Sequence, residues 1–211
     1  SKIGCNFYPK NKTTLPLTIE GTSIPLAQKH NETIGSAQVK SAILLAALNT
    51  PGITQILVSK KSRDHTENLL KEIKADIKIQ KIKKKYLISL KGQKNLYNFN
   101  LNIPGDPSSA APFIVLALLS PNSKLVIKNI NCNPTRIGFI NILKKMNANI
   151  KIKNLKKRDG EPIGNIIVKS SSLKPIQCPM SLVPSAIDEF PLLFIAASLI
   201  NGVSKFNGID E

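Results

Sequence analysis

Polar residues stand at the starts of three apolar segments, in a pattern that could bind an anion. They are Ser36 and Gln38 in the first segment, Asp106, Ser108 and Ser109 in the second, and Ser185 and Asp188 in the third. A helix N-terminus presents unpaired N–H groups and the positive end of the helix dipole, so three converging ends would bind phosphates or carboxylates. Helix N-capping is the alternative for each residue. It is favoured for Ser108 and Ser109, and both explanations stay open for Ser36 and Asp188.

The apolar segments are predicted helices, each leading into a strand or a strand-like stretch. They cover residues 36–52, 106–122 and 186–202, and the first two precede predicted strands at 53–58 and 124–130. The first two helices are apolar on nearly every face, so we expect them to be buried on all sides.

A second, amphipathic helix repeats at an offset of 73 residues. Residues 62–79 align with 135–152, and each segment starts with a hydroxyl residue, Ser62 or Thr135, that is predicted to cap the helix. Strands are predicted at 76–79, 86–90, 99–103, 149–152 and 165–168. The sequence therefore predicts an α/β protein of βαβαββ units, used twice and begun a third time, with buried helices inside and sheets outside.

Composition excludes several classes of protein. The chain has 211 residues, 42% of them hydrophobic, which excludes a disordered tail, and its apolar runs are too short to span a membrane.

A net charge of +17 would suit a nucleic acid or a phosphate partner. The only arginines are Arg63, Arg136 and Arg158, so a Lys-, Asn- and Ile-rich compositional bias is the favoured explanation of this charge. The three widely spaced cysteines are predicted to be reduced thiols.

Six segments of the sequence together resemble one enzyme family. They contain Ser-Ala-Gln-Val-Lys at 36–40, Asn-Thr-Pro-Gly at 49–52, Ser-Arg-Asp-His-Thr-Glu at 62–67, Gly-Asp-Pro-Ser-Ser at 105–109, Asn-Pro-Thr-Arg at 133–136 and Ile-Asp-Glu-Phe-Pro at 187–191. In order and spacing they resemble the EPSP synthases (3-phosphoshikimate 1-carboxyvinyltransferases), especially the second bacterial class. The resemblance implies the enolpyruvyl transferase fold, an inside-out α/β barrel with two domains of three βαβαββ units each.

The resemblance also implies that the chain holds two partial domains. The hinge of such enzymes falls near the motif at 105–109, so we expect residues 1–104 to be the later part of the first domain and 105–211 to be the beginning of the second. No signal segment follows Ser1, and the family's Lys-Ser-x-x-x-Arg and Lys-Glu-Ser-Asp-Arg segments do not occur in the sequence. An internal fragment that is inactive by itself is therefore expected.

The implied reaction transfers the enolpyruvyl group of phosphoenolpyruvate to the 5-hydroxyl of shikimate 3-phosphate, releases phosphate, and uses no cofactor or metal. The residues assigned by resemblance to shikimate 3-phosphate are Ser36, Ala37, Gln38, Ser62, Arg63 and Asp188, and Gln38 is also assigned to phosphoenolpyruvate. Asp188 is the expected catalytic residue, which accepts the proton of the attacking hydroxyl. The planar fork of Arg63 suits phosphate oxygens. The resemblance gives Arg136 no firm catalytic duty and Glu189 no role.

Other sites and functions explain parts of the sequence less well. His65 and Glu67 are predicted to lie on an exposed helix surface rather than to bind a metal. The related UDP-N-acetylglucosamine enolpyruvyl transferase shares the fold and the reaction, but the motifs at 36–40 and 62–67 favour the shikimate enzyme. A basic nucleic-acid-binding module is the alternative from another class, although few aromatic residues are present. We expect small-molecule substrates, a cytoplasmic location, no nucleic-acid or membrane partner, and a monomeric full-length protein.

Overall fold

The chain divides into two compact units, Ser1–Phe99 and Asn100–Glu211. The computed structural model describes residues 2–11 and 14–209. Each unit has its own sheet and its own hydrophobic core. Within the described residues, no helix is long and apolar enough to cross a membrane.

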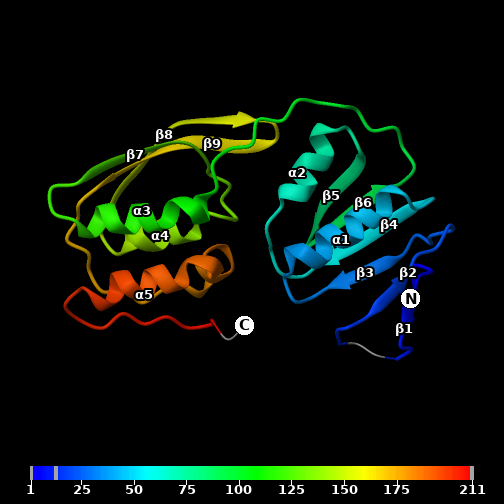
Figure 1. Cartoon of the computed structure of the whole chain (residues 1–211), viewed down its shortest axis with the longest axis horizontal. Coiled ribbons are helices and arrows are strands. Elements are labelled where there is room, and N and C mark those ends of the chain that lie inside the picture. The colour runs from blue at the N-terminus through cyan, green and yellow to red at the C-terminus, as the bar shows by residue number, and fades with distance from the viewer. Residues whose placement is uncertain (1, 12–13, 210–211) are drawn as a thin grey trace. The chain divides into compact units, whose positions relative to one another are not determined.

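The first unit contains a two-stranded sheet, a four-stranded sheet and two helices (Figure 1). Its elements are β1 (Asn6–Tyr8), β2 (Thr18–Glu20), β3 (Lys29–Glu32), α1 (Ala37–Leu48), β4 (Ile53–Val58), α2 (His65–Glu72), β5 (Asp76–Ile82) and β6 (Lys85–Lys91). The larger sheet has the order β3-β4-β6-β5, in which β3 runs parallel to β4 and the other neighbours are antiparallel.

The core of the first unit lies between this sheet and the two helices. Alternation along β4 buries Ile56 and Val58, which belong to one core cluster with Leu44 of α1 and Leu70 of α2. Each such side chain contributes about 1.5–3 kcal/mol when fully buried. The packing of this cluster fixes the starts of α1 and α2 relative to the sheet.

The second unit also packs helices against a sheet, which here has three antiparallel strands in the order β7-β9-β8. Its elements are α3 (Pro107–Leu119), β7 (Lys124–Asn131), α4 (Gly138–Lys145), β8 (Asn149–Arg158), β9 (Glu161–Lys169), the 3₁₀ helices η1 (Met180–Ser185) and η2 (Ile187–Glu189), and α5 (Phe190–Ser198). Helices α3 and α4 lie against one face of the sheet, and α5 packs on α3 and α4 (Figure 1). One cluster joins Ile114, Phe139, Ile166 and Phe190.

The predicted α/β class and the repeat are confirmed, but the predicted caps are wrong. Helices α2 and α4 begin at His65 and Gly138, which are 73 positions apart like the sequence repeat. Both begin three residues after the predicted cap, and neither has a side-chain cap bond. The Thr135 hydroxyl instead donates to Asn133 Oδ1 at 2.7 Å, which stabilises the turn before α4.

The strand predicted at 99–103 is also wrong. No residue of this segment lies in a strand; only Gly105 pairs, in an isolated parallel bridge with Ile130. The backbone N–H of Asn102 donates to the Asp159 side chain at 3.0 Å, so a carboxylate takes the place of a partner strand there.

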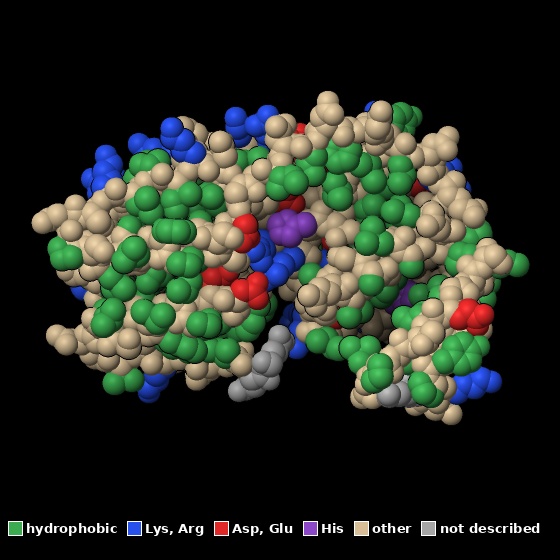
Figure 2. All heavy atoms as spheres, in the orientation of Figure 1, with side chains coloured by type: hydrophobic (Ala, Val, Ile, Leu, Met, Phe, Trp, Pro, Cys, Tyr) green, Lys and Arg blue, Asp and Glu red, His purple; other side chains and the backbone are tan. Residues whose placement is uncertain are grey.

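The apolar helices are not buried on all sides as predicted. Val39 and Leu45 of α1 are 47% and 56% exposed, and Phe113 and Leu116 of α3 are 61% and 63% exposed. Figure 2 shows apolar side chains gathered over α3 and α5. Each of these helices has one face in the core of its unit, while a second, equally apolar face is exposed.

Candidate functional site

Three of the substrate-assigned residues lie at the start of α1. Ser36 is the N-cap, and its Oγ accepts a hydrogen bond from the Val39 N–H at 3.3 Å. Ser36 and Ala37 are half-buried, while Gln38 is exposed. A hydroxyl that accepts a hydrogen bond can still donate one, so capping by Ser36 is compatible with contact to a substrate oxygen.

The loop before α1 is folded around the carboxylate of Glu32, the last residue of β3. One oxygen, Oε1, accepts hydrogen bonds from the backbone N–H groups of Ile34, Gly35 and Ser36 at 3.0, 2.7 and 3.0 Å. Glu32 is 4% exposed. It therefore fixes the backbone that delivers Ser36 to the helix start, a role that no residue pattern around Glu32 indicated.

The other substrate-assigned segment of this unit, Ser62 and Arg63, is tied to α1 by a buried lysine. Lys40 Nζ lies 2.6 Å from the Arg63 carbonyl oxygen and 2.7 Å from Glu67 Oε1 on α2. The prediction that Glu67 is exposed is wrong, because the residue is 3% exposed. The ammonium of Lys40 supplies the compensating charge that a buried carboxylate requires.

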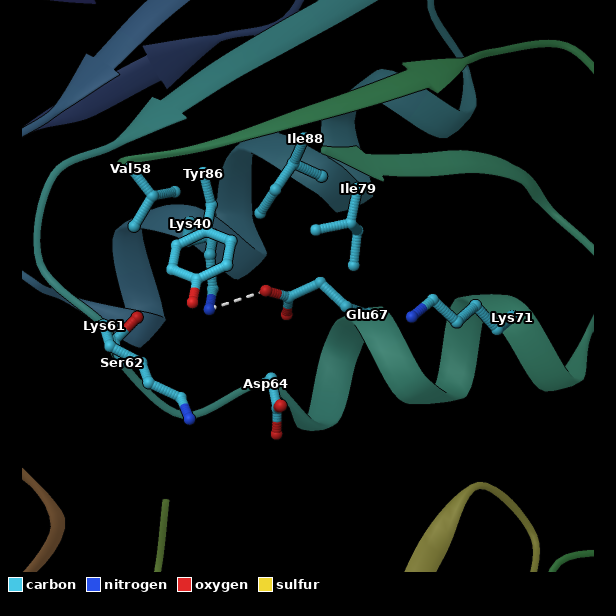
Figure 3. A pocket seen from close by; sticks show the side chains of 10 residues that line it. All are labelled: Lys40, Val58, Lys61, Ser62, Asp64, Glu67, Lys71, Ile79, Tyr86 and Ile88. Atoms are coloured by element: carbon cyan, nitrogen blue, oxygen red, sulfur yellow. Dashed lines mark ion pairs between the residues drawn. The ribbon is translucent and has the colours of Figure 1, made fainter. Parts of the chain in front are cut away.

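A cavity of about 390 Å³ lies beside this ion pair (Figure 3). Val58, Ile79 and Ile88 form its apolar wall on the sheet side, and Lys61 and Ser62 line it from the loop. In the part of the chain that the structure describes, Ser62 Oγ is buried and has no hydrogen-bond partner. A buried hydroxyl in this state can bind a polar ligand group at little further desolvation cost.

In the second unit, Arg136 holds three polar side chains together. Its Nη2 lies 2.7 Å from Asp106 Oδ1 and 2.7 Å from Ser108 Oγ, and its Nη1 lies 3.3 Å from Asp188 Oδ2. The Arg136 side chain is 12% exposed, whereas that of Asp188 is 49% exposed. The predicted catalytic carboxylate is thus held on one side and open to solvent on another.

Asp106, and not Ser108 or Ser109, caps α3, so the capping prediction for the two serines is wrong. Asp106 Oδ2 accepts from the Ser109 backbone N–H at 2.8 Å and from the Ser109 hydroxyl at 2.9 Å. Burial acts to raise the pKa of Asp106, but hydrogen bonds from Ser109, Arg136 and the Ser108 backbone outweigh it and lower this pKa. Asp106 is therefore a fixed negative charge beside Arg136.

Glu189, which was expected to have no role, is a structural member of the same cluster. It is 3% exposed, and its Oε1 accepts a hydrogen bond from the Ser108 hydroxyl. This bond joins the end of η2 to the first turn of α3, so it helps to fix the backbone that carries the neighbouring Asp188.

The structure brings together some predicted residues within each unit. In the first unit, the α1 start and the Ser62–Arg63 segment are linked through Lys40. In the second unit, Asp188 is linked to the α3 start through Arg136. Sequence reasoning missed the role of Lys40, although a single lysine inside an apolar helix is a signal for a buried partner. The described residues contain no group of three or more His, Cys, Asp or Glu side chains that could hold a metal ion.

Solved structures define the fold class of the chain. The enolpyruvyl transferase NikO from Streptomyces tendae superimposes with a TM-score of 0.66 over 95% of this chain and 48% of its own, at 15% identity, which is a likeness of fold alone. An EPSP synthase from Acinetobacter baumannii superimposes with a TM-score of 0.81 at 40% identity, over 95% of this chain and 44% of its own. The chain therefore has the fold of enolpyruvyl transferases.

Sequence comparison narrows this class to one family. The model of EPSP synthase (3-phosphoshikimate 1-carboxyvinyltransferase) matches residues 2–211, and the chain belongs to this family. Relatives named 3-phosphoshikimate 1-carboxyvinyltransferase include one from Petrotoga mobilis, 47% identical, and one from Zymomonas mobilis, 42% identical. Each alignment covers 100% of this chain and 48% or 47% of the relative, so the chain spans about half the length of the curated relatives it matches.

Proposed function

We propose that the chain is part of an EPSP synthase, which transfers the enolpyruvyl group of phosphoenolpyruvate to the 5-hydroxyl of shikimate 3-phosphate and releases phosphate. The observation that carries this proposal is the family match over residues 2–211. We assign residues 1–104 to the later part of the first domain and residues 105–211 to the beginning of the second. The polypeptide of full family length is a cytoplasmic monomer without a nucleic-acid partner.

In this proposal the first unit binds the anionic substrates. Ser36, Ala37 and Gln38 contact shikimate 3-phosphate at the start of α1, and Gln38 also contacts phosphoenolpyruvate. The half-buried Ser36 and Ala37 and the exposed Gln38 support this assignment, as does the positive end of the α1 dipole. Ser62 and Arg63 bind the phosphate group or its surroundings, and the buried, unpartnered Ser62 Oγ supports a polar ligand there.

Asp188 is the proposed proton acceptor. As the 5-hydroxyl oxygen bonds to C2 of phosphoenolpyruvate, the C2=C3 π bond breaks, C3 takes up a proton, and the hydroxyl proton passes to the Asp188 carboxylate. In the later collapse of the tetrahedral intermediate, phosphate leaves with the electrons of the C2–O bond, and C3 loses a proton as the double bond forms again. A general base has to lie within hydrogen-bond reach of the proton that it takes. The half-exposed position of Asp188 and its orientation by Arg136 suit this task.

The test is phosphate release by a polypeptide of full family length that contains this chain. We expect release only when both substrates are present, and Asp188→Asn to lower kcat by about 10²–10⁴-fold, as loss of a general base does. Asp76→Asn is the matched control, since it makes the same change at an exposed position of β5. Absence of phosphate release with both substrates would contradict the proposal.

Two further readouts separate the proposal from the alternatives. Phosphate release with UDP-N-acetylglucosamine in place of shikimate 3-phosphate would indicate the related transferase. Salt-dependent retention on DNA without any phosphate release would indicate a nucleic-acid-binding module. We expect neither result, and we expect the 211-residue chain alone to release no phosphate.

A further inference from the structure

Lys40 makes two short polar contacts inside the first unit. Its ammonium lies 2.7 Å from Glu67 Oε1 and 2.6 Å from the Arg63 carbonyl oxygen, and the side chains of Lys40 and Glu67 are 3% and 4% exposed. The ammonium has donors only, and the two contacts use two of its three hydrogens. One charged group therefore joins α1, the loop before α2 and α2 itself.

The fold does not require a charged pair at this place, as the second unit shows. By the repeat offsets, Lys40 corresponds to Ala110 of α3 and Glu67 corresponds to Ile140 of α4. Both are buried in one core cluster, at 5% and 0% exposure. Equivalent positions are thus occupied by two charged side chains in α1 and α2, and by two apolar side chains in α3 and α4.

The charged pair is also a costly way to stabilise the first unit. Desolvation of two buried ions offsets most or all of their attraction, and well-packed apolar residues often serve as well or better. In the described structure, Glu67 Oε2 is buried without a hydrogen-bond partner. A pair built for stability alone would satisfy this oxygen.

The contact that apolar side chains cannot replace is the one to the Arg63 carbonyl. Ser36 and Gln38 lie within the turn of α1 that precedes Lys40, so the Lys40 ammonium fixes the Arg63 backbone relative to that helix start. Groups that bind a charged substrate must be held in place, since a displacement of about 1 Å can cost roughly 10²-fold in rate.

We propose that Lys40 is a positioning residue, which holds the Arg63 backbone so that the guanidinium meets the phosphate of shikimate 3-phosphate. The proposal rests on the proposed function. Lys40 acts through Arg63 and does not itself touch the substrate.

The experiment uses the double variant Lys40→Met/Glu67→Met in the polypeptide of full family length. Replacing both partners leaves no uncompensated buried charge, so the variant folds, while the bond to the Arg63 carbonyl is lost. We expect the KM for shikimate 3-phosphate to rise about tenfold, and the KM for phosphoenolpyruvate to change less than about twofold. Ile56→Val, which removes one buried methyl group from the core of the same unit at a residue that does not line the cavity, is the control for packing and should leave both KM values unchanged.

A second background separates positioning of Arg63 from a general packing effect. In Arg63→Ala protein, the Lys40→Met/Glu67→Met change should alter the KM for shikimate 3-phosphate by less than about twofold, because the group that Lys40 positions is gone. An equal rise in both backgrounds, or no rise in either, overturns the role of Lys40 while the proposed function stands. A wild-type protein that releases no phosphate with both substrates overturns the proposed function and this role together.

Discussion

Removing the Glu32 carboxylate should loosen the loop that leads to α1. Its Oε1 accepts three backbone N–H groups, those of Ile34, Gly35 and Ser36, at 2.7–3.0 Å. A hydrogen bond to a charged group contributes about 1.5–3 kcal/mol, but three donors that share one oxygen do not contribute independently. Exposed Ile34 and half-buried Gly35 and Ser36 are also within reach of water after the change.

We therefore expect Glu32→Ala to lower the free energy of unfolding by about 3 kcal/mol. Glu32→Gln should cost about 1–2 kcal/mol, because a neutral amide oxygen still accepts the N–H groups, at roughly half the strength. If Ser36 binds shikimate 3-phosphate as proposed, Glu32→Ala in the polypeptide of full family length should also raise the KM for this substrate more than Glu32→Gln does, because Ser36 shifts with the loop.

The measurement is equilibrium urea unfolding followed by circular dichroism, together with KM determination. Glu20→Ala is the matched control, since the exposed Glu20 of β2 accepts hydrogen bonds from the Asn6 and Tyr8 side chains. It should cost less than about 0.5 kcal/mol. A Glu32→Ala protein as stable as the Glu20→Ala protein would refute the view that this carboxylate organises the loop.

Three further changes test the second unit. Arg136→Lys keeps the charge but loses the planar fork, so the kcat of the polypeptide of full family length should fall about tenfold. An unchanged kcat would argue against orientation of Asp188, the proposed proton acceptor, by Arg136. Gly138→Ala would place a Cβ 2.1 Å from Ser185 Oγ and 2.7 Å from the Ser185 carbonyl carbon. Urea unfolding should therefore show a free energy of unfolding lower by about 1–3 kcal/mol. Gly21→Ala, where no atom lies within 4 Å of the added Cβ, is the control and should change this free energy very little. Folding lowers the pKa of Asp106, so the ionised carboxylate stabilises the folded state above its unfolded pKa, and this stabilisation is lost as the pH falls through the folded pKa. The difference in unfolding free energy between wild type and Asp106→Asn should therefore shrink in acid titrations from pH 7 to about 3. A constant difference would contradict this prediction.

The repeated elements could be predicted because they depend on local pattern. The second helices begin at His65 and Gly138, at the offset read from the sequence, and the strands after them form where alternation indicated. For α3 the sequence favours the serines as caps, whereas Asp106 caps the helix in the structure. Asp, Ser and Asn serve equally well as caps, so only the backbone geometry decides between them.

The polar cluster of each unit could not be predicted, because it depends on contacts between distant positions. Glu67 looks exposed on its own helix, and only Lys40, 27 positions earlier, makes its burial possible. Arg136 similarly joins Asp106 and Asp188, which lie 30 and 52 positions away. Helical periodicity reports which face of a helix is apolar, but it carries no information about which distant charge meets a charge on that face.

The exposed apolar faces of α1, α3 and α5 set up a competition when copies of this chain meet in solution. Such faces attract one another, while a net charge of +17 keeps the copies apart. Salt shortens the range of the repulsion, from about 30 Å at 0.01 M to about 3 Å at 1 M, but leaves the apolar attraction in place. We therefore expect dilute buffer to keep the chain dispersed and concentrated salt to promote its self-association, the reverse of the salt response of a complex held together by charge.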